Sequence, residues 1–176
     1  KGSIVDSFPA IEIDKVKAWD FRLANINTSE CLNVAYGVDA NYLDGVGVSI
    51  TSIVLNNRHI NLDFYIIADV YNDAFFQKVA KLAEQYQLRI TLYRINTDKL
   101  QCLPCTQVWS RAMYFRLFAF QLLGLTLDRL LYLDADVVCK GDISQLLHLD
   151  LNGAVAAVVK DVDPMQEKAA SRLSDP

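Results

Sequence analysis

The fold is decided by the stretch Cys31-Leu-Asn-Val-Ala-Tyr-Gly-Val-Asp-Ala-Asn-Tyr42. Its first six residues form a compact apolar run typical of a buried strand, and Gly37 then opens a polar turn. Residues 43–55 suit a helix, although Gly45 and Gly47 weaken its beginning. A buried strand followed by a helix is the repeating unit of a parallel α/β sheet.

Strands and helices continue to alternate after this unit. Residues 63–68 and 89–94 are predicted as strands because they are rich in aromatic and β-branched side chains. Between them, Asn72 can cap a helix. The apolar residues of that helix recur at helical spacing: Phe75, Val79, Leu82 and Tyr86.

The second half of the chain repeats the pattern with longer connections. Residues 107–123 are predicted as a long, mostly buried helix that ends at Gly124. Residues 130–133 suit a short strand buried on both faces, and residues 154–159 suit a fifth strand. The whole pattern predicts an α/β fold in which a mostly parallel sheet is flanked by helices on both sides.

The two ends of the chain are less regular. Residues 1–30 are expected to be an N-terminal extension or a peripheral helix, and residues 1–3 are interpreted as a cloning remnant. The last three residues, Ser174-Asp-Pro176, suit the opening of a turn rather than the end of a domain. This ending favours a chain that is truncated at its C-terminus.

Composition limits the classes of function. Of the 176 residues, 52% are hydrophobic and 22% are charged, which is typical of a globular domain. The formal net charge of −4 argues against a protein that coats nucleic acid or docks on an anionic membrane by charge. No run approaches the ~20 apolar residues of a membrane span, and no secretory signal opens the chain, so a cytoplasmic protein is expected. The four cysteines are too scattered for a disulfide scaffold.

The polar residues that follow the first predicted strand are candidates for binding a nucleotide. Ligands of open parallel sheets bind outside the carboxyl ends of the strands. There, Gly37 permits a tight turn, Asp39 and Asn41 offer groups for a base edge or ribose hydroxyls, and Tyr42 can stack on a flat ring. The same residue types also make ordinary turns, so a turn without a ligand is the alternative.

The second polar strand end carries two carboxylates, in Leu131-Tyr-Leu-Asp-Ala-Asp-Val137. In extended backbone the side chains of residues i and i+2 point to the same face, so Asp134 and Asp136 can flank one hard cation. Mg²⁺ typically binds one or two carboxylates with phosphate oxygens and water, and it neutralises a departing diphosphate. Ala135 is small enough to let a nucleotide approach the backbone. A pair of solvated aspartates is the alternative.

Further charged residues are candidates for the same cleft. Arg116 lies within an otherwise apolar helix and needs a partner, either an acidic side chain or a phosphate or sugar. Asp161 and Asp163 follow the expected fifth strand. They can line the cleft or be ordinary surface carboxylates.

Three blocks, in this order, resemble glycosyltransferase family 8, whose members are retaining enzymes of the GT-A fold. The blocks are residues 34–42, 114–117 and 131–137, and the resemblance extends over residues 30–170. It is strongest to enterobacterial enzymes that add glucose or galactose to the outer core of lipopolysaccharide. The resemblance implies a GT-A, Rossmann-like, nucleotide-sugar-binding domain over residues 31–176 that is incomplete at its C-terminus. It also implies transfer of a hexose from UDP-glucose or UDP-galactose with retention of configuration.

The resemblance assigns roles to individual residues. Asp134 and Asp136 are expected to bind Mg²⁺ or Mn²⁺, and Arg116 to contact the donor sugar or diphosphate. Asp161 falls where relatives place an acidic residue near the sugar or acceptor, and it joins the donor-site residues. The other implied UDP contacts are Gly37, Val38, Asp39, Ala40, Asn41, Tyr42 and Ala135.

Family members carry further motifs downstream, among them a late histidine that completes the metal shell. Neither His59 nor His148 stands at that position. The resemblance therefore leaves the catalytic residues beyond residue 176. It also leaves there a basic tail that brings such enzymes to the cytoplasmic face of the inner membrane. A non-catalytic nucleotide-sugar-binding fragment is thus the first alternative function.

Two other functions are weaker alternatives. An aspartate-nucleophile phosphatase also uses D-x-D after an apolar strand, but its fold normally begins with that strand. Cys102-Leu-Pro-Cys105 has the spacing of a redox or zinc motif. No second cysteine pair completes a zinc site.

Overall fold

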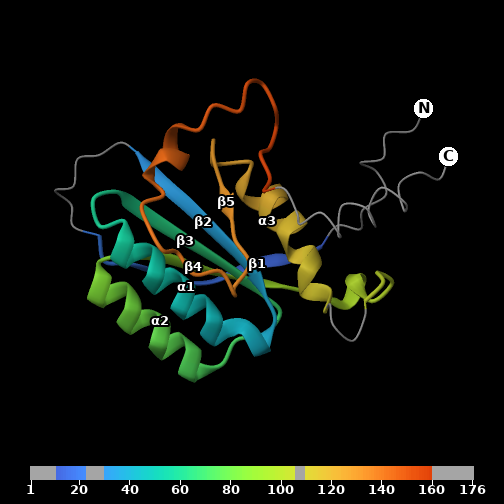
Figure 1. The fold of residues 1–176 in the computed structure, drawn as a ribbon. Coiled ribbons are helices and arrows are strands. Elements are labelled where there is room, and N and C mark those ends of the chain that lie inside the picture. Colours follow the sequence, from blue (N-terminus) through green and yellow to red (C-terminus); the bar gives the residue numbers. More distant parts are fainter. Residues whose placement is uncertain (1–10, 23–29, 106–109, 160–176) are drawn as a thin grey trace.

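The computed structural model describes residues 11–22, 30–105 and 110–159. They form a five-stranded sheet with helices on both faces (Figure 1). The strands are β1 (Ile13–Asp20), β2 (Cys31–Val38), β3 (Asn61–Ala68), β4 (Arg89–Ile95) and β5 (Leu131–Tyr132). The α-helices are α1 (Leu43–Asn56), α2 (Asp73–Tyr86) and α3 (Phe115–Leu123). Short 3₁₀ segments are η2 (Ala40–Tyr42), η3 (Asp98–Leu100), η4 (Arg111–Tyr114) and η5 (Ser144–His148).

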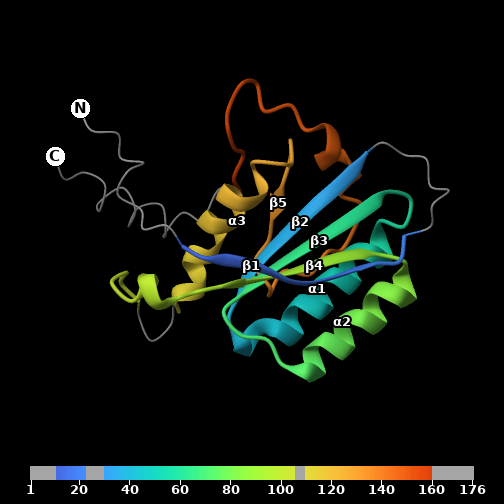
Figure 2. The same ribbon diagram turned by 180° about the vertical axis from the view of Figure 1, so that it is seen from behind.

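The sheet has the strand order β1-β4-β3-β2-β5. Only β1, paired with β4 at one edge, is antiparallel in this described sheet. The chain passes from β2 through α1 to β3, and through α2 to β4, always in one direction across the sheet. Right-handed crossovers therefore place α1 and α2 on the same face. The chain then returns past β2 to form β5, and α3 covers the opposite face (Figure 2). The predicted mostly parallel α/β fold is confirmed.

Alternate side chains of the central strands divide the core into two layers, because a strand points successive residues to opposite faces. Tyr36 and Phe64 pack towards α1 and α2. Tyr65 and Ile67 pack towards α3. Since β3 has strands on both edges and helices on both faces, its residues 62–68 are all buried, which explains the nearly continuous apolar run.

The elements predicted between residues 31 and 94 are confirmed closely. The helix after β3 begins where expected, because Asn72 Oδ1 accepts the backbone N–H of Phe75 at 2.8 Å. It ends at Gln87, whose φ of 56° lies in the left-handed region.

The expectation of an irregular extension or peripheral helix before residue 31 is wrong for residues 13–20, which form β1. The register of β1 shifts between Lys15 and Lys17. This irregularity breaks the alternation of polar and apolar residues that marks a strand in sequence. As the edge strand, β1 is also mostly exposed, so polar residues are tolerated along it.

The second half departs further from the prediction. Within residues 107–123, the α-helix begins only at Phe115, after η4, and positions 107–109 lie outside the described residues. The helix is also less buried than expected, since Leu117 and Phe120 are 45% and 47% exposed. Gly124 follows α3 with a φ of −66°, so no left-handed cap ends the helix.

The two last predicted strands also need correction. β5 is only two residues long and half-buried, because it is an edge strand that pairs with β2 alone. Residues 154–159 are exposed and form no strand among the described residues; Val155 and Val159 are almost fully exposed. An apolar run forms a stable strand only where a neighbouring strand pairs with it and other elements cover its side chains. In the described structure, residues 154–159 have neither.

Asp63, near the amino end of β3, is a buried carboxylate. Its side chain, 5% exposed, lies 3.2 Å from Arg22 Nη1 and 3.2 Å from Arg89 Nε. Burial raises the pKa of Asp63, and the two guanidinium groups counteract this shift. Burial also raises the pKa of the neighbouring Cys31 thiol to about 12.

After β5 the chain runs back along α1. The backbone N–H of Cys139 donates to Ser52 Oγ at 2.9 Å, and that of Ile143 donates to Asn57 Oδ1 at 2.8 Å. This return brings η5 to the amino end of β2. In the described part of the chain, no helix is long and apolar enough to cross a bilayer.

Candidate active site

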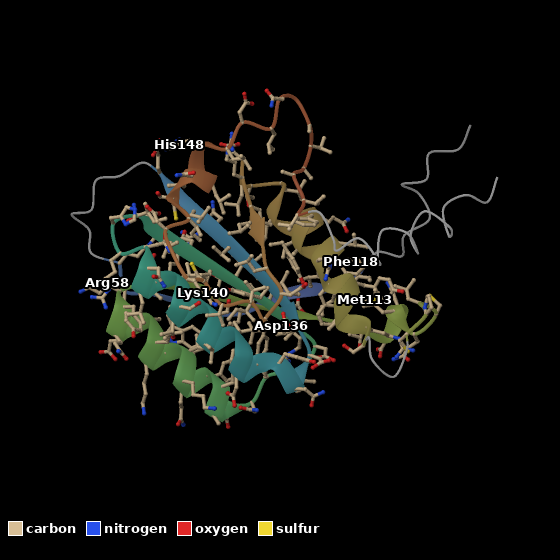
Figure 3. All side chains as sticks on the ribbon, in the orientation of Figure 1. Arg58, Met113, Phe118, Asp136, Lys140 and His148 are labelled. Carbon is tan, nitrogen blue, oxygen red and sulfur yellow. The ribbon has the colours of Figure 1, made fainter. Side chains whose placement is uncertain are left out.

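The candidate site lies where the strand order reverses. β3 and β5 flank β2 on opposite sides. From β2 the chain adds β3 and β4 on one side, and it later returns to add β5 on the other. The carboxyl ends of β2 and β5 therefore form a topological switch point, where α/β sheets bind ligands. Residues 39–42 follow β2 and residues 133–136 follow β5, so both segments lie at this end of the sheet. Figure 3 shows Asp136 at this end of the sheet, and His148 at the other end.

Gly37 is required by close packing rather than by the tight turn that was expected. It lies inside β2, and a Cβ at this position would come within 2.7 Å of both Phe115 Cβ and Tyr132 Oη. The absence of a side chain lets α3 and β5 approach the backbone of β2.

The turn after β2 is built by Asp39. Its Oδ1 accepts the backbone N–H of Asn41 at 3.0 Å and so caps η2, while its Oδ2 accepts the hydroxyl of Ser110 at 2.7 Å. Ala40 and Asn41 are exposed, and Tyr42 is 54% exposed, so the side chains after Asp39 face solvent. Val38 is buried at 3% exposure, which leaves only its backbone available to a ligand.

The segment Asp134-Ala-Asp136 is a turn and not the extended backbone that was expected. The backbone N–H of Val137 donates to the carbonyl oxygen of Asp134 at 3.2 Å. Both aspartates are exposed, whereas Ala135 is buried at 8% exposure. A Cβ on Gly45 would lie 3.0 Å from the Ala135 carbonyl oxygen, so the turn rests on the first turn of α1.

Arg116 and Asp134 form an ion pair. Arg116 Nη2 lies 3.0 Å from Asp134 Oδ1, and the guanidinium carbon lies 5.3 Å from the centre of the Tyr132 ring. Of the two partners considered for Arg116, the structure therefore places an acidic side chain beside it. That side chain belongs to the aspartate pair expected to bind the metal ion. Both side chains stay about half exposed, so either can exchange its partner for a ligand.

The residues present fit part of a magnesium or manganese site. Asp134 and Asp136 are both exposed. Carboxylate oxygens are ligands that such cations combine with phosphate oxygens and water. Within residues 11–22, 30–105 and 110–159, however, no three His, Cys, Asp or Glu side chains gather in a group able to hold a metal ion. The two histidines lie elsewhere: His59 Nε2 is 3.6 Å from Asp142, and His148 Nε2 is 3.4 Å from Glu30.

Three residues near the site were not singled out in the sequence. Ser110 precedes η4 as an N-cap, a signal that its residue type carries. Tyr132 packs beside Arg116, and burial raises its pKa. Asp69 directly follows β3, as Asp39 follows β2, so both lie at the carboxyl ends of neighbouring parallel strands. Its Oδ1 is buried and accepts no hydrogen bond in the structure.

Two other sets of candidate residues remain. Asp161 and Asp163 lie outside the described residues, so their place in the cleft stays a prediction. Cys102 and Cys105 are both free and exposed, and Cys102 Sγ donates to the carbonyl oxygen of Lys99 at 3.4 Å.

Comparisons with known proteins show the family of the chain. The model of glycosyl transferase family 8 matches residues 33–175. The chain is 96% identical, over 98% of its length, to a lipopolysaccharide 1,2-glucosyltransferase of Escherichia coli K12, of which it covers 51%. It is 38% identical, over 81% of its length, to a lipopolysaccharide 1,3-galactosyltransferase of Salmonella typhimurium, of which it covers 42%. The chain thus spans about half the length of these curated relatives.

Solved structures show the same fold. The galactosyltransferase LgtC, solved with donor and acceptor sugar analogues, matches with a TM-score of 0.59 at 22% identity, over 68% of this chain and 43% of that one. The bifunctional glycosyltransferase WbbM matches with a TM-score of 0.56 at 22% identity, over 74% of this chain and 23% of that one. These neighbours are GT-A glycosyltransferases, so the expected GT-A fold is confirmed. With the match to its family model, the chain belongs to glycosyl transferase family 8.

Proposed function

We propose that this chain carries the donor-binding half of an enzyme that transfers glucose or galactose from a UDP-sugar to a lipopolysaccharide core. The observation that carries the proposal is the switch point at the carboxyl ends of β2 and β5. Asp39 bonds Ser110 after β2, and Arg116 pairs with Asp134 after β5. The relatives support the acceptor class, since their names specify glucose or galactose transfer in lipopolysaccharide.

In this proposal, Asp39 and Asn41 hold the uracil or ribose and Tyr42 stacks on the base. Asp134 and Asp136 would hold Mg²⁺ or Mn²⁺. When bound, this ion would neutralise the negative charge of the diphosphate. Arg116 adds a cation for the diphosphate or sugar. Asp161 is assigned to the sugar or acceptor side on the family resemblance alone.

The transfer breaks the bond between the anomeric carbon and the diphosphate oxygen, which keeps the electron pair as UDP departs. The acceptor hydroxyl oxygen bonds to that carbon on the face that UDP leaves, so configuration is retained, and the hydroxyl proton is released. In the donor half, Asp39 and Arg116 orient UDP so that this bond is presented to the acceptor. We place the enzyme at the cytoplasmic face of the inner membrane, where a lipid-linked acceptor is available.

Calorimetric titration tests the donor site. UDP-glucose and UDP-galactose are titrated into the chain with and without Mn²⁺, and then into Asp134→Ala. Asp142→Ala is the control, because Asp142 is an exposed aspartate at the other end of the sheet. We expect binding that needs Mn²⁺, is lost in Asp134→Ala and survives in Asp142→Ala. Binding that is independent of Mn²⁺ and survives Asp134→Ala would refute the metal role.

A non-catalytic nucleotide-sugar-binding fragment is the second candidate. The chain covers about half of its relatives, and the described residues supply only an incomplete metal shell. Hydrolysis of UDP-glucose by this chain, followed with and without Mn²⁺, separates the two. Binding without any hydrolysis favours the fragment, and metal-dependent hydrolysis favours the enzyme.

A further inference from the structure

Ser110 joins the two segments that the donor site needs. Its Oγ donates a hydrogen bond to Asp39 Oδ2 at 2.7 Å, across 71 positions in sequence. The same Oγ accepts the backbone N–H of Ala112 at 3.3 Å, so Ser110 caps η4. One hydroxyl thus serves as donor to the turn after β2 and as acceptor for the segment that leads to Arg116.

The Asp39 carboxylate is thereby held on both sides. Its Oδ1 is engaged by the Asn41 N–H of its own turn, and its Oδ2 by Ser110. A carboxylate offers about four acceptor positions, so about two stay free for a ligand. Since the plane of the carboxylate is set before a ligand arrives, less ordering has to accompany binding.

A second contact fixes the same two segments. Phe115 follows η4, and its Cβ would be 2.7 Å from a side chain on Gly37, so the start of α3 rests on the backbone of β2. Ser110 precedes η4 and bonds Asp39, two residues beyond Gly37. With one contact at each end of η4, the segment has little freedom to slide or rotate against the turn.

We propose that Ser110 is a positioning residue for donor binding. Its hydroxyl orients Asp39 for the nucleoside and holds η4 and α3 where Arg116 reaches the diphosphate or sugar. The inference rests on the proposed function, because it takes Asp39 and Arg116 as donor contacts. Alanine at this position removes both hydrogen bonds, whereas threonine retains a hydroxyl that can make them.

The first test compares the UDP affinities of Ser110→Ala and Ser110→Thr by calorimetry with Mn²⁺. Ser144→Ala is the matched control, because Ser144 also bonds an aspartate, Asp142, through its backbone N–H and its hydroxyl. It lies in η5, at the opposite end of the sheet. We expect about tenfold weaker binding in Ser110→Ala, in line with the loss of a charge-assisted hydrogen bond. Ser110→Thr and Ser144→Ala should bind UDP as the wild type does.

A double-mutant cycle with Asp39→Ala separates positioning from a merely structural role. If Ser110 acts largely through Asp39, Ser110→Ala changes UDP affinity much less in the Asp39→Ala background than in the wild type. Fully additive losses would overturn the inference. So would a Ser110→Ala variant with a lowered melting temperature but unchanged UDP affinity when folded.

The outcomes distinguish failure of the role of Ser110 from failure of the proposed donor site. A wild-type chain that binds no UDP overturns the proposed donor site and the role of Ser110 with it. UDP binding that is weakened by Asp39→Ala and untouched by Ser110→Ala overturns the role of Ser110 alone.

Discussion

Arg116 Nη2 lies 3.0 Å from Asp134 Oδ1, so the cation expected to meet the donor and a carboxylate expected to bind the metal ion face each other. The pair comes from α3 and from the turn after β5, which meet across the switch point. In the absence of a donor, each side chain neutralises the other. A divalent cation that approaches Asp134 therefore competes with Arg116.

This competition gives a prediction for Arg116→Gln. Without nucleotide, the variant should bind Mn²⁺ about threefold more tightly, because an exposed ion pair of this kind contributes up to ~1 kcal/mol. With Mn²⁺ present, it should bind UDP at least about tenfold more weakly, because a charge-assisted contact to phosphate is lost. Electron paramagnetic resonance of free Mn²⁺ and calorimetry with UDP measure the two effects. Arg129→Gln is the control, because Arg129 bonds the carbonyl oxygen of Leu149 away from the site. Weaker Mn²⁺ binding in Arg116→Gln would contradict the competition.

Gly37→Ala should destabilise the fold. The added Cβ would meet Phe115 and Tyr132 at 2.7 Å, and relief of this contact requires α3 or β5 to shift. A loss of about 1–3 kcal/mol in the free energy of unfolding is expected from such overpacking. Urea denaturation followed by circular dichroism measures it.

Gly47→Ala is the matched control for that experiment. Gly47 sits inside α1, and apart from its chain neighbours and the adjacent backbone of that helix no atom lies within 4 Å of a Cβ there. Alanine should leave stability unchanged or raise it by up to ~1 kcal/mol through helix propensity. Equal destabilisation by both substitutions would show that close packing at Gly37 is not the cause.

Asp63→Asn should lower stability by about 2 kcal/mol, because it leaves Arg22 and Arg89 facing each other without the carboxylate between them. Asp44→Asn breaks an ion pair with Lys78 whose side chains are 76% and 63% exposed. That control should change stability by less than ~0.5 kcal/mol. Thermal unfolding of both variants at neutral pH measures the difference. A loss in Asp44→Asn as large as that in Asp63→Asn would show that burial is not decisive.

The thiol of Cys31 should be unreactive near pH 8. Burial raises its pKa to about 12, so the reactive thiolate appears only as the pH rises towards that value. Cys102 and Cys105 are exposed and should be the first to react with a disulfide reagent. Mass spectrometry of the labelled chain over pH 7–10 identifies the modified residues. Early labelling of Cys31 at pH 8 would contradict its burial.

Sequence patterns predicted the elements that are buried on both sides. β2, β3 and β4 read as apolar runs because strands and helices cover them, and the Asn72 cap marks the start of α2. The same reasoning did not predict the segments at the edges of the sheet correctly. β1 is exposed and bulged, β5 is two residues long, and residues 154–159 have no partner strand within the described structure. A pattern of apolar residues in the sequence indicates burial. Because an edge strand is only partly buried, its pattern is weaker.

The sequence by itself determined which side chains are candidates for the donor site: the Asp39 turn, Arg116 and the aspartate pair stand in an order that resembles one enzyme family. It could not determine which of them touch. Only the tertiary structure paired Arg116 with Asp134 and Ser110 with Asp39, and it replaced the extended aspartate pair with a turn resting on α1. The reason is physical: residue type is local, whereas these contacts arise because β5 returns beside β2 and Gly37 lets α3 pack against it.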